Sequence, residues 1–184
     1  DKHVRRTPDP PMRADAGGIK TGSLFSGECG GKEELSEFAA RMNRRLTPHG
    51  LRLMPLRFNE KRALMYIYRP ERLREDLEDP LAREILVSLG YPIESGGGCV
   101  ARLAKRVREN GAFPHEIGLF LGYPSEDVMG FISGGKPKCT GMWKVYGDVD
   151  SAMSKFDAYR SCTRIMREYY RRTRSMDKLI MGCS

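Results

Sequence analysis

The chain has 184 residues, of which 40% are hydrophobic and 30% charged, and its formal net charge is +8. A chain of this length and composition is typical of one domain with a hydrophobic core and a well-solvated surface. No apolar run approaches the roughly 18 to 20 residues that a membrane-spanning helix needs, so we expect no membrane partner.

The excess of basic residues has two explanations. It suits an acidic partner such as a nucleic acid or a phosphate-bearing ligand, and it also keeps a protein soluble. No nucleic-acid-binding motif accompanies the charge, so we favour solubility as the explanation.

Cysteine usage bears on the compartment and on metal binding. The five cysteines are scattered, include no C-x-x-C pair, and match neither a disulfide framework nor a zinc-binding spacing. They are Cys29, Cys99, Cys139, Cys162 and Cys183. We therefore expect reduced thiols, no metal site and a cytoplasmic protein. The first 18 residues agree with this location, because they contain no apolar stretch of the kind found in signal peptides.

The first part of the chain contains an arm, a helix and two strand-like runs. Residues 1–18 are rich in Pro, Gly and charge, which predicts a flexible arm before a single domain over 19–184. Apolar residues on one face predict a helix over 32–46. The strand-like runs follow at 51–56 and 63–68.

These two strand-like runs differ in pattern. Residues 63–68 (ALMYIY) are apolar on both alternating faces, which is typical of a central strand. Residues 51–56 contain Pro55, which cannot donate a ladder hydrogen bond and therefore indicates an edge strand or a bulge.

Helical and strand-like segments follow one another in the rest of the chain without a strict order. The predicted helices are 70–89, which Asp79-Pro80 can break, one around 100–107, a short one from Ser125, and 149–170, the longest. The predicted strands are 117–121 and 142–146. We therefore predict an α+β fold with one small mixed or mostly antiparallel sheet of about four strands covered by helices. That sheet should contain 63–68 together with both later strands.

The segment FPHEIGLFLGYP, residues 113–124, is the most unusual part of the chain. Pro114 biases the backbone to an extended conformation, so we expect His115 and Glu116 in a loop that leads into a strand. Such a pair can act as a base with its orienting carboxylate, or supply metal ligands. Neighbouring side chains of an extended chain point to opposite faces, however. A histidine that only pins the loop to a backbone carbonyl fits the same pattern.

Two longer segments, FPHEIGLFLGYPSEDVMGFI and GMWKVYGDVDSAMSKFDAYRSC, resemble DUF3793, a bacterial family of unknown function. The opening GGIKTGSLF is also similar to the start of that family, and the resemblance covers roughly residues 14–180. No activity is established for the family, so the resemblance indicates which residues belong to its characteristic segments but not which ligand or reaction they serve. The residues that it places in signature segments are Lys20, His115, Glu116, Lys144 and Tyr146.

These five residues form a coherent chemical set. The lysines supply positive charge, the histidine donates or accepts, the glutamate accepts, and the tyrosine offers a phenol. We predict that they line one pocket for a small ligand with a carboxylate or phosphate group; the identity of any cofactor stays open. Lys144 and Tyr146 share one face of a strand, but they are equally the solvent side of a strand whose core residues are Trp143 and Val145.

An enzyme is the alternative to this binding role. In that interpretation, His115 and Glu116 are the acid-base pair, and Cys139 is the nucleophile. Lys136 and Lys138 lie close to Cys139 in the sequence, and positive charge of this kind favours the reactive thiolate.

Nucleic-acid binding is the third interpretation. The last predicted helix carries basic residues at i, i+4, i+7 and i+11, with tyrosines nearby that can stack on bases. The basic residues are Arg160, Arg164, Arg167 and Arg171. Arginines that extend along the flank of a helix to reach solvent produce the same stripe, so we rank this function last.

Overall fold

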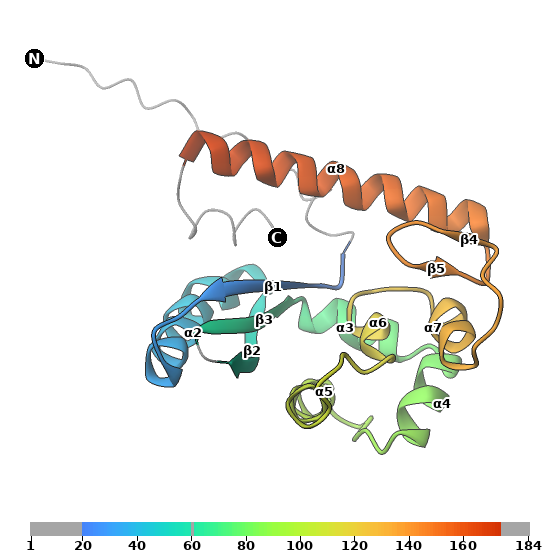
Figure 1. The fold of residues 1–184 in the computed structure, drawn as a ribbon, viewed down its shortest axis with the longest axis horizontal. Coiled ribbons are helices and arrows are strands. Elements are labelled where there is room, and N and C mark those ends of the chain that lie inside the picture. Colours follow the sequence, from blue (N-terminus) through green and yellow to red (C-terminus); the bar gives the residue numbers. More distant parts are fainter. Residues whose placement is uncertain (1–19, 60, 174–184) are drawn as a thin grey trace, which may run out of the picture.

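The computed structural model describes residues 20–59 and 61–173, with side chains as far as residue 161. A three-stranded sheet packs with several helices, and a two-stranded sheet lies beside the long helix α8 (Val149–Thr173) (Figure 1). The predicted α+β class is confirmed. Within the described residues, no helix is both long and apolar enough to cross a bilayer. The predicted arm, residues 1–18, lies outside the described part of the chain.

The larger sheet is antiparallel and has the order β1-β3-β2. Its strands are β1 (Gly22–Glu28), β2 (Arg52–Asn59) and β3 (Arg62–Tyr68). β3 is the central strand, as its pattern predicts, and every residue after Arg62 is buried because both faces are covered. β2 is an edge strand with a register shift between Pro55 and Arg57, so the prediction from Pro55 is confirmed.

Helix α2 (Lys32–Leu46) covers one face of this sheet and has its predicted bounds. Its apolar stripe packs on alternate residues of β3, in a cluster that includes Met42, Leu46, Met65 and Ile67. After the helix, η1 (Thr47–His49) leads into Gly50. The φ of Gly50 is 71°, a left-handed conformation that glycine adopts without strain.

On the opposite face of the sheet, α5 (Gly96–Glu109) packs on β2, and the apolar cluster there extends to α3 (Pro70–Leu77) and α4 (Pro80–Ser88). The predicted helix over 70–89 is broken at the Asp79-Pro80 pair, as the sequence allows. The Asp79 carboxylate caps α4, because it accepts a hydrogen bond from the Ala82 N–H at 2.9 Å.

The segment 117–121 is a short helix and not the strand predicted above. α6 (Ile117–Phe120) makes helical hydrogen bonds, among them one from the Leu121 N–H to the Ile117 carbonyl at 3.2 Å. An apolar run this short has no readable period, and a helical turn buries consecutive residues as well as a strand does. In the folded protein this turn packs closely on α7 (Ser125–Ile132), because a Cβ at Gly118 would lie only 2.8 Å from Val128.

The last predicted strand, 142–146, is shorter than expected and belongs to a separate sheet. β5 (Lys144–Val145) pairs antiparallel with β4 (Cys139–Thr140) in a small hairpin. α8 packs on the apolar side of the hairpin, in a cluster that includes Trp143, Val145, Ala152 and Phe156. The predicted single sheet is therefore replaced by two sheets, because α8 and not β3 covers this strand. α8 is the longest helix of the described residues, as predicted.

Candidate functional site

His115 and Glu116 occupy the loop between α5 and α6, and their side chains have opposite environments. A turn closes this loop, with the Ile117 N–H donating to the Pro114 carbonyl at 3.1 Å. The His115 side chain is exposed, whereas Glu116 is only 2% exposed. The two members of the predicted acid-base pair therefore face different surroundings.

The Glu116 carboxylate belongs to a buried network with α5. Its Oε1 accepts hydrogen bonds from the Tyr91 hydroxyl at 2.7 Å and from Arg106 Nε at 2.5 Å. Burial and the hydrogen bond to Glu116 raise the pKa of Tyr91, so its hydroxyl keeps its proton and remains a donor. Both bonds anchor the loop to the body of the protein. In the enzyme alternative, the Glu116 carboxylate would orient His115, but here it is already hydrogen-bonded to Tyr91 and Arg106.

His115 and Lys144, which are far apart in the chain, meet at the aromatic ring of Phe131. The His115 ring lies 4.9 Å from the Phe131 ring, edge to face, and Lys144 Nζ lies 5.5 Å from the centre of the same ring. Phe131 is 40% exposed near the C-terminal end of α7. A cation above an aromatic face is attracted by the ring quadrupole, which helps to hold the ammonium group there. Sequence reasoning missed Phe131, because no local pattern distinguishes an exposed phenylalanine from a core one.

A hollow of about 290 Å³ opens beside His115. Its lining is mostly apolar and consists of Leu89, Arg106, Asn110, Ala112, Phe113, Pro114, His115, Glu116 and Ile132. Phe113 is 48% exposed and Ile132 is 39% exposed, so large apolar side chains face solvent here. Exposed apolar surface around a concavity is typical of ligand or partner sites. We call the lining of this hollow, together with Phe131 and Lys144, the His115 surface.

Asp127 and Tyr146 hold the hairpin against α7 and thereby position Lys144. The buried Asp127 carboxylate accepts three hydrogen bonds: from Trp143 Nε1 at 2.7 Å, and from the N–H groups of Tyr146 and the next residue at 2.8 Å each. The Tyr146 ring packs on Gly130, where any side chain would collide with it. Tyr146, which was predicted to bind a ligand, therefore packs against the helix that carries the aromatic platform.

Lys20 lies next to a different aromatic ring. Its Nζ is 5.4 Å from the centre of the Tyr159 ring on α8, and Lys20 is not part of the lining of the hollow. Of the five predicted ligand residues, two line the hollow (His115 and Glu116) and Lys144 reaches the neighbouring platform. A single pocket that contains all five stays a prediction.

Cys139 is half-buried on β4, at the edge of an apolar cluster that includes Trp143, Val145 and Phe156. In the described part of the chain, no hydrogen bond joins its thiol to His115. These contacts do not assemble the nucleophile, base and orienting carboxylate that covalent catalysis requires. Among the residues that the structure describes, no three His, Cys, Asp or Glu side chains form a group that could hold a metal ion.

A second hollow, of about 350 Å³, lies where three helices begin. Asp79 caps α4, Glu126 lies in the first turn of α7, and Asp148 accepts from the Ser151 N–H of α8 at 2.9 Å. Carboxylates at these positions satisfy free N–H groups and interact favourably with the helix dipole. Helix capping and first-turn positions therefore account for three of the acidic side chains; Asp76 of α3 accepts a hydrogen bond from the Thr21 hydroxyl, and we assign this hollow no ligand.

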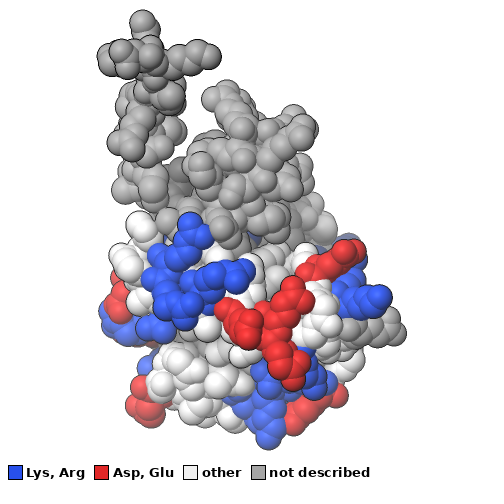
Figure 2. All heavy atoms as spheres, turned by 90° about the vertical axis from the view of Figure 1, so that its left-hand side faces the viewer, with Lys and Arg blue, Asp and Glu red and all other residues white. Residues whose placement is uncertain are grey.

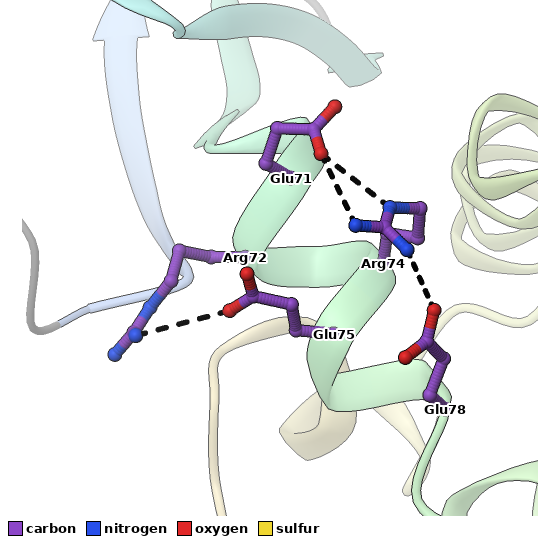
Figure 3. A network of polar contacts seen from close by, with 5 residues as sticks. All are labelled: Glu71, Arg72, Arg74, Glu75 and Glu78. Atoms are coloured by element: carbon purple, nitrogen blue, oxygen red, sulfur yellow. Dashed lines mark hydrogen bonds and ion pairs between the residues drawn. The ribbon is translucent and has the colours of Figure 1, made fainter.

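Both signs of charge occur on the face of the molecule that Figure 2 shows, where a group of basic side chains lies next to a group of acidic ones. On α3, Arg74 contacts both Glu71 and Glu78, and Arg72 contacts Glu75 (Figure 3). Exposed pairs of this kind add little stability, but they partly neutralise the arginines.

The predicted arginine stripe is described only at its first member. Arg160 is exposed and lies 3.5 Å from Asp157, one turn earlier on α8. The side chains of Arg164, Arg167 and Arg171 lie outside the described part of the structure. Nucleic-acid binding through this stripe stays a prediction.

The fold and the site define an α+β protein in which two basic side chains meet on an exposed aromatic ring beside an apolar hollow. The chain belongs to the family described as protein of unknown function (DUF3793), which matches residues 16–180. No curated protein and no solved structure matches the chain. Its function must therefore be argued from the site itself.

Proposed function

We propose that this protein is a binding module that holds a small anionic ligand with an apolar or aromatic body at the His115 surface. The observation that carries the proposal is the meeting of His115 and Lys144 on the exposed ring of Phe131, beside the hollow. These three side chains come from the α5–α6 loop, the hairpin and α7, respectively. A surface built from three elements is a more specific arrangement than a charged loop.

The charge at this surface supports an anionic ligand. Neither His115 nor Lys144 forms an ion pair with any described residue. Among the described residues that line the hollow, Glu116 supplies the one carboxylate, and it already accepts hydrogen bonds from Tyr91 and Arg106. An incoming carboxylate or phosphate would gain charge-assisted hydrogen bonds without displacing an internal partner.

The shape and lining of the hollow support an apolar body on the ligand. An engineered cavity of about 150 Å³ is large enough to hold benzene. The hollow has about 290 Å³ and presents the half-exposed ring of Phe113 and the side chain of Ile132. An aromatic or short aliphatic group would therefore fit in it and cover apolar surface that now faces water.

We propose binding rather than catalysis because the other candidate catalytic groups are engaged elsewhere. The Glu116 carboxylate is held by two donors, and Cys139 packs at the edge of an apolar cluster. We also propose that binding takes place in the cytoplasm. The free thiols of Cys29, Cys99 and Cys139 support this compartment.

Titration of the labelled protein with phenyl phosphate, followed by NMR, tests this function. Phenyl phosphate should perturb the signals of His115, Phe131 and Lys144. It should also bind about tenfold more tightly than benzyl alcohol, which has the same ring without the charge, because a hydrogen bond to a charged group contributes about 1.5 to 3 kcal/mol. Lys144→Ala should weaken phenyl phosphate to about the level of the neutral probe.

The matched control is Lys155→Ala, which removes a lysine from the second, acidic hollow. This substitution should leave the affinity for phenyl phosphate unchanged. Equal affinity for the charged and the neutral probe, or an equal loss in both lysine variants, would contradict an anion site at His115.

A further inference from the structure

We propose that the natural ligand of the His115 surface is presented by another protein, as an acidic segment that carries a large apolar side chain. The inference rests on the proposed function and names the kind of molecule that supplies the anion. Three properties support this inference: the apolar surface extends beyond the hollow, the hollow has the size of one large side chain, and the charged groups at the edge of the surface are basic.

The apolar part of the surface is wider than the hollow. Phe113 is 48% exposed and Ile132 39% exposed at the lining, while Phe131, 40% exposed, lies outside the lining and contacts His115 there. A molecule confined to the hollow would leave the ring of Phe131 in water. A polypeptide segment can fill the hollow and cover this neighbouring ring at the same time, which increases the apolar area removed from water.

The hollow itself is suited to one anchoring side chain. Its volume of about 290 Å³ has room for the side chain of a phenylalanine or leucine. Energetically dominant contacts between proteins commonly consist of a large side chain in such a pocket, surrounded by residues that exclude water. Phe131 and Lys144 would form part of that surrounding ring.

Charge complementarity selects an acidic segment. His115 and Lys144 stand at the edge of the apolar area without a described ionic partner, and the Glu116 carboxylate is withdrawn into its network with Arg106. Glutamate or aspartate on either side of the anchoring side chain would therefore lie near basic groups. They would not be repelled by a free carboxylate in the lining of the hollow. A nucleic acid fits less well, because it has no apolar side chain to fill the hollow.

Fluorescence anisotropy with a labelled, glutamate-rich peptide that contains a central Leu-Phe pair tests the proposal. Two control peptides isolate the two properties: one has Ala-Ala in place of the pair, and the other has lysine in place of every glutamate. The full-length protein should bind the first peptide at least tenfold more tightly than either control. Equal binding of the three peptides would overturn the proposal.

Substitutions on the protein provide the matching test. Phe131→Ala and Lys144→Glu should each weaken the acidic peptide at least tenfold. Met153→Ala, which changes an apolar residue on α8 that is 43% exposed, should have no effect. All three positions are at the surface, and melting curves by circular dichroism check that each variant is folded. A loss that is equal in all three variants would overturn the proposal.

The binding results for the two probes, together with a competition experiment, separate this inference from the proposed function. If phenyl phosphate binds in a Lys144-dependent way but the acidic peptide binds no better than its Ala-Ala control, the small-ligand site stands and the protein partner is wrong. If neither probe binds, both proposals are wrong. If duplex DNA or phosphatidylglycerol vesicles displace the peptide at equal charge concentration, the selection of an acidic protein segment is wrong.

Discussion

Arg102 and Arg106 lie one helical turn apart on α5 but have different surroundings. Arg106 contacts the buried carboxylate of Glu116, whereas the Nε of Arg102 is buried without a hydrogen-bond partner among the described residues. A buried donor without an acceptor costs about 1 to 3 kcal/mol, while breaking a buried ion pair leaves an uncompensated charge. The same substitution should therefore have opposite consequences at the two positions.

We predict that Arg106→Met lowers the free energy of unfolding by about 2 to 3 kcal/mol, because Glu116 then keeps only Tyr91 as a donor; partial exposure of Arg106 moderates the loss. Arg102→Met should be neutral or stabilise by up to about 1 kcal/mol, since methionine retains the apolar stem and removes the unsatisfied donor. Urea unfolding measured by circular dichroism compares the two. Similar losses in both variants would show that the Glu116 network does not stabilise the loop.

At the scale of elements, the contact between α7 and the hairpin decides where Lys144 lies. The hairpin has only two residues in each strand, too few for an independently stable sheet. It is held instead by the Asp127 carboxylate, by the Tyr146 ring on Gly130, and by the apolar cluster under α8. The position of Lys144 over its aromatic platform therefore depends on side-chain packing between elements.

We predict that Gly130→Ala destabilises the protein by about 1 to 3 kcal/mol, because the new methyl group would overlap the ring of Tyr146. The displaced hairpin should also reduce the affinity for phenyl phosphate. Gly96→Ala is the control: this glycine is in the first turn of α5 with open space around it, so alanine should be neutral or stabilise by up to about 1 kcal/mol. Thermal melts and the titration described above check both. Unchanged stability in the Gly130 variant would contradict the packing argument.

At the scale of the whole molecule, the described residues already contain the apolar clusters on both faces of the larger sheet and under α8. The first residues of the chain have no periodic apolar pattern that could offset an ordering cost of roughly 1 to 2 kcal/mol per residue. We therefore expect the N-terminal arm to add little to the stability of the fold.

Deletion of residues 1–15 should shift the melting temperature by less than about 5 °C, which corresponds to roughly 1 to 2 kcal/mol at this chain length. Differential scanning calorimetry of the truncated and the full-length chain makes the comparison. A larger decrease would show that the arm is part of the folded structure.

Several elements could be predicted from the sequence because local patterns determine them. The apolar face of α2 repeats at helical spacing over four turns, so its bounds follow from periodicity. The central position of β3 follows from apolar residues on both faces, and the break between α3 and α4 follows from a capping aspartate before a proline. In each case, the residues that carry the signal lie within the element itself. The same holds for the long helix α8.

The tertiary structure alone decided the features that depend on distant neighbours. Residues 117–121 are too short to show a period, and in the folded protein they contain a helical turn that packs closely on Val128. Phe131 is exposed because no described element fully covers that end of α7. Its neighbours in the sequence do not indicate whether another element will cover it. The sequence identified His115 and Lys144 as candidates, but only the packing of the hairpin on α7 brings them to one ring. Local periodicity specifies elements, whereas the relative position of side chains far apart in the chain depends on how those elements pack.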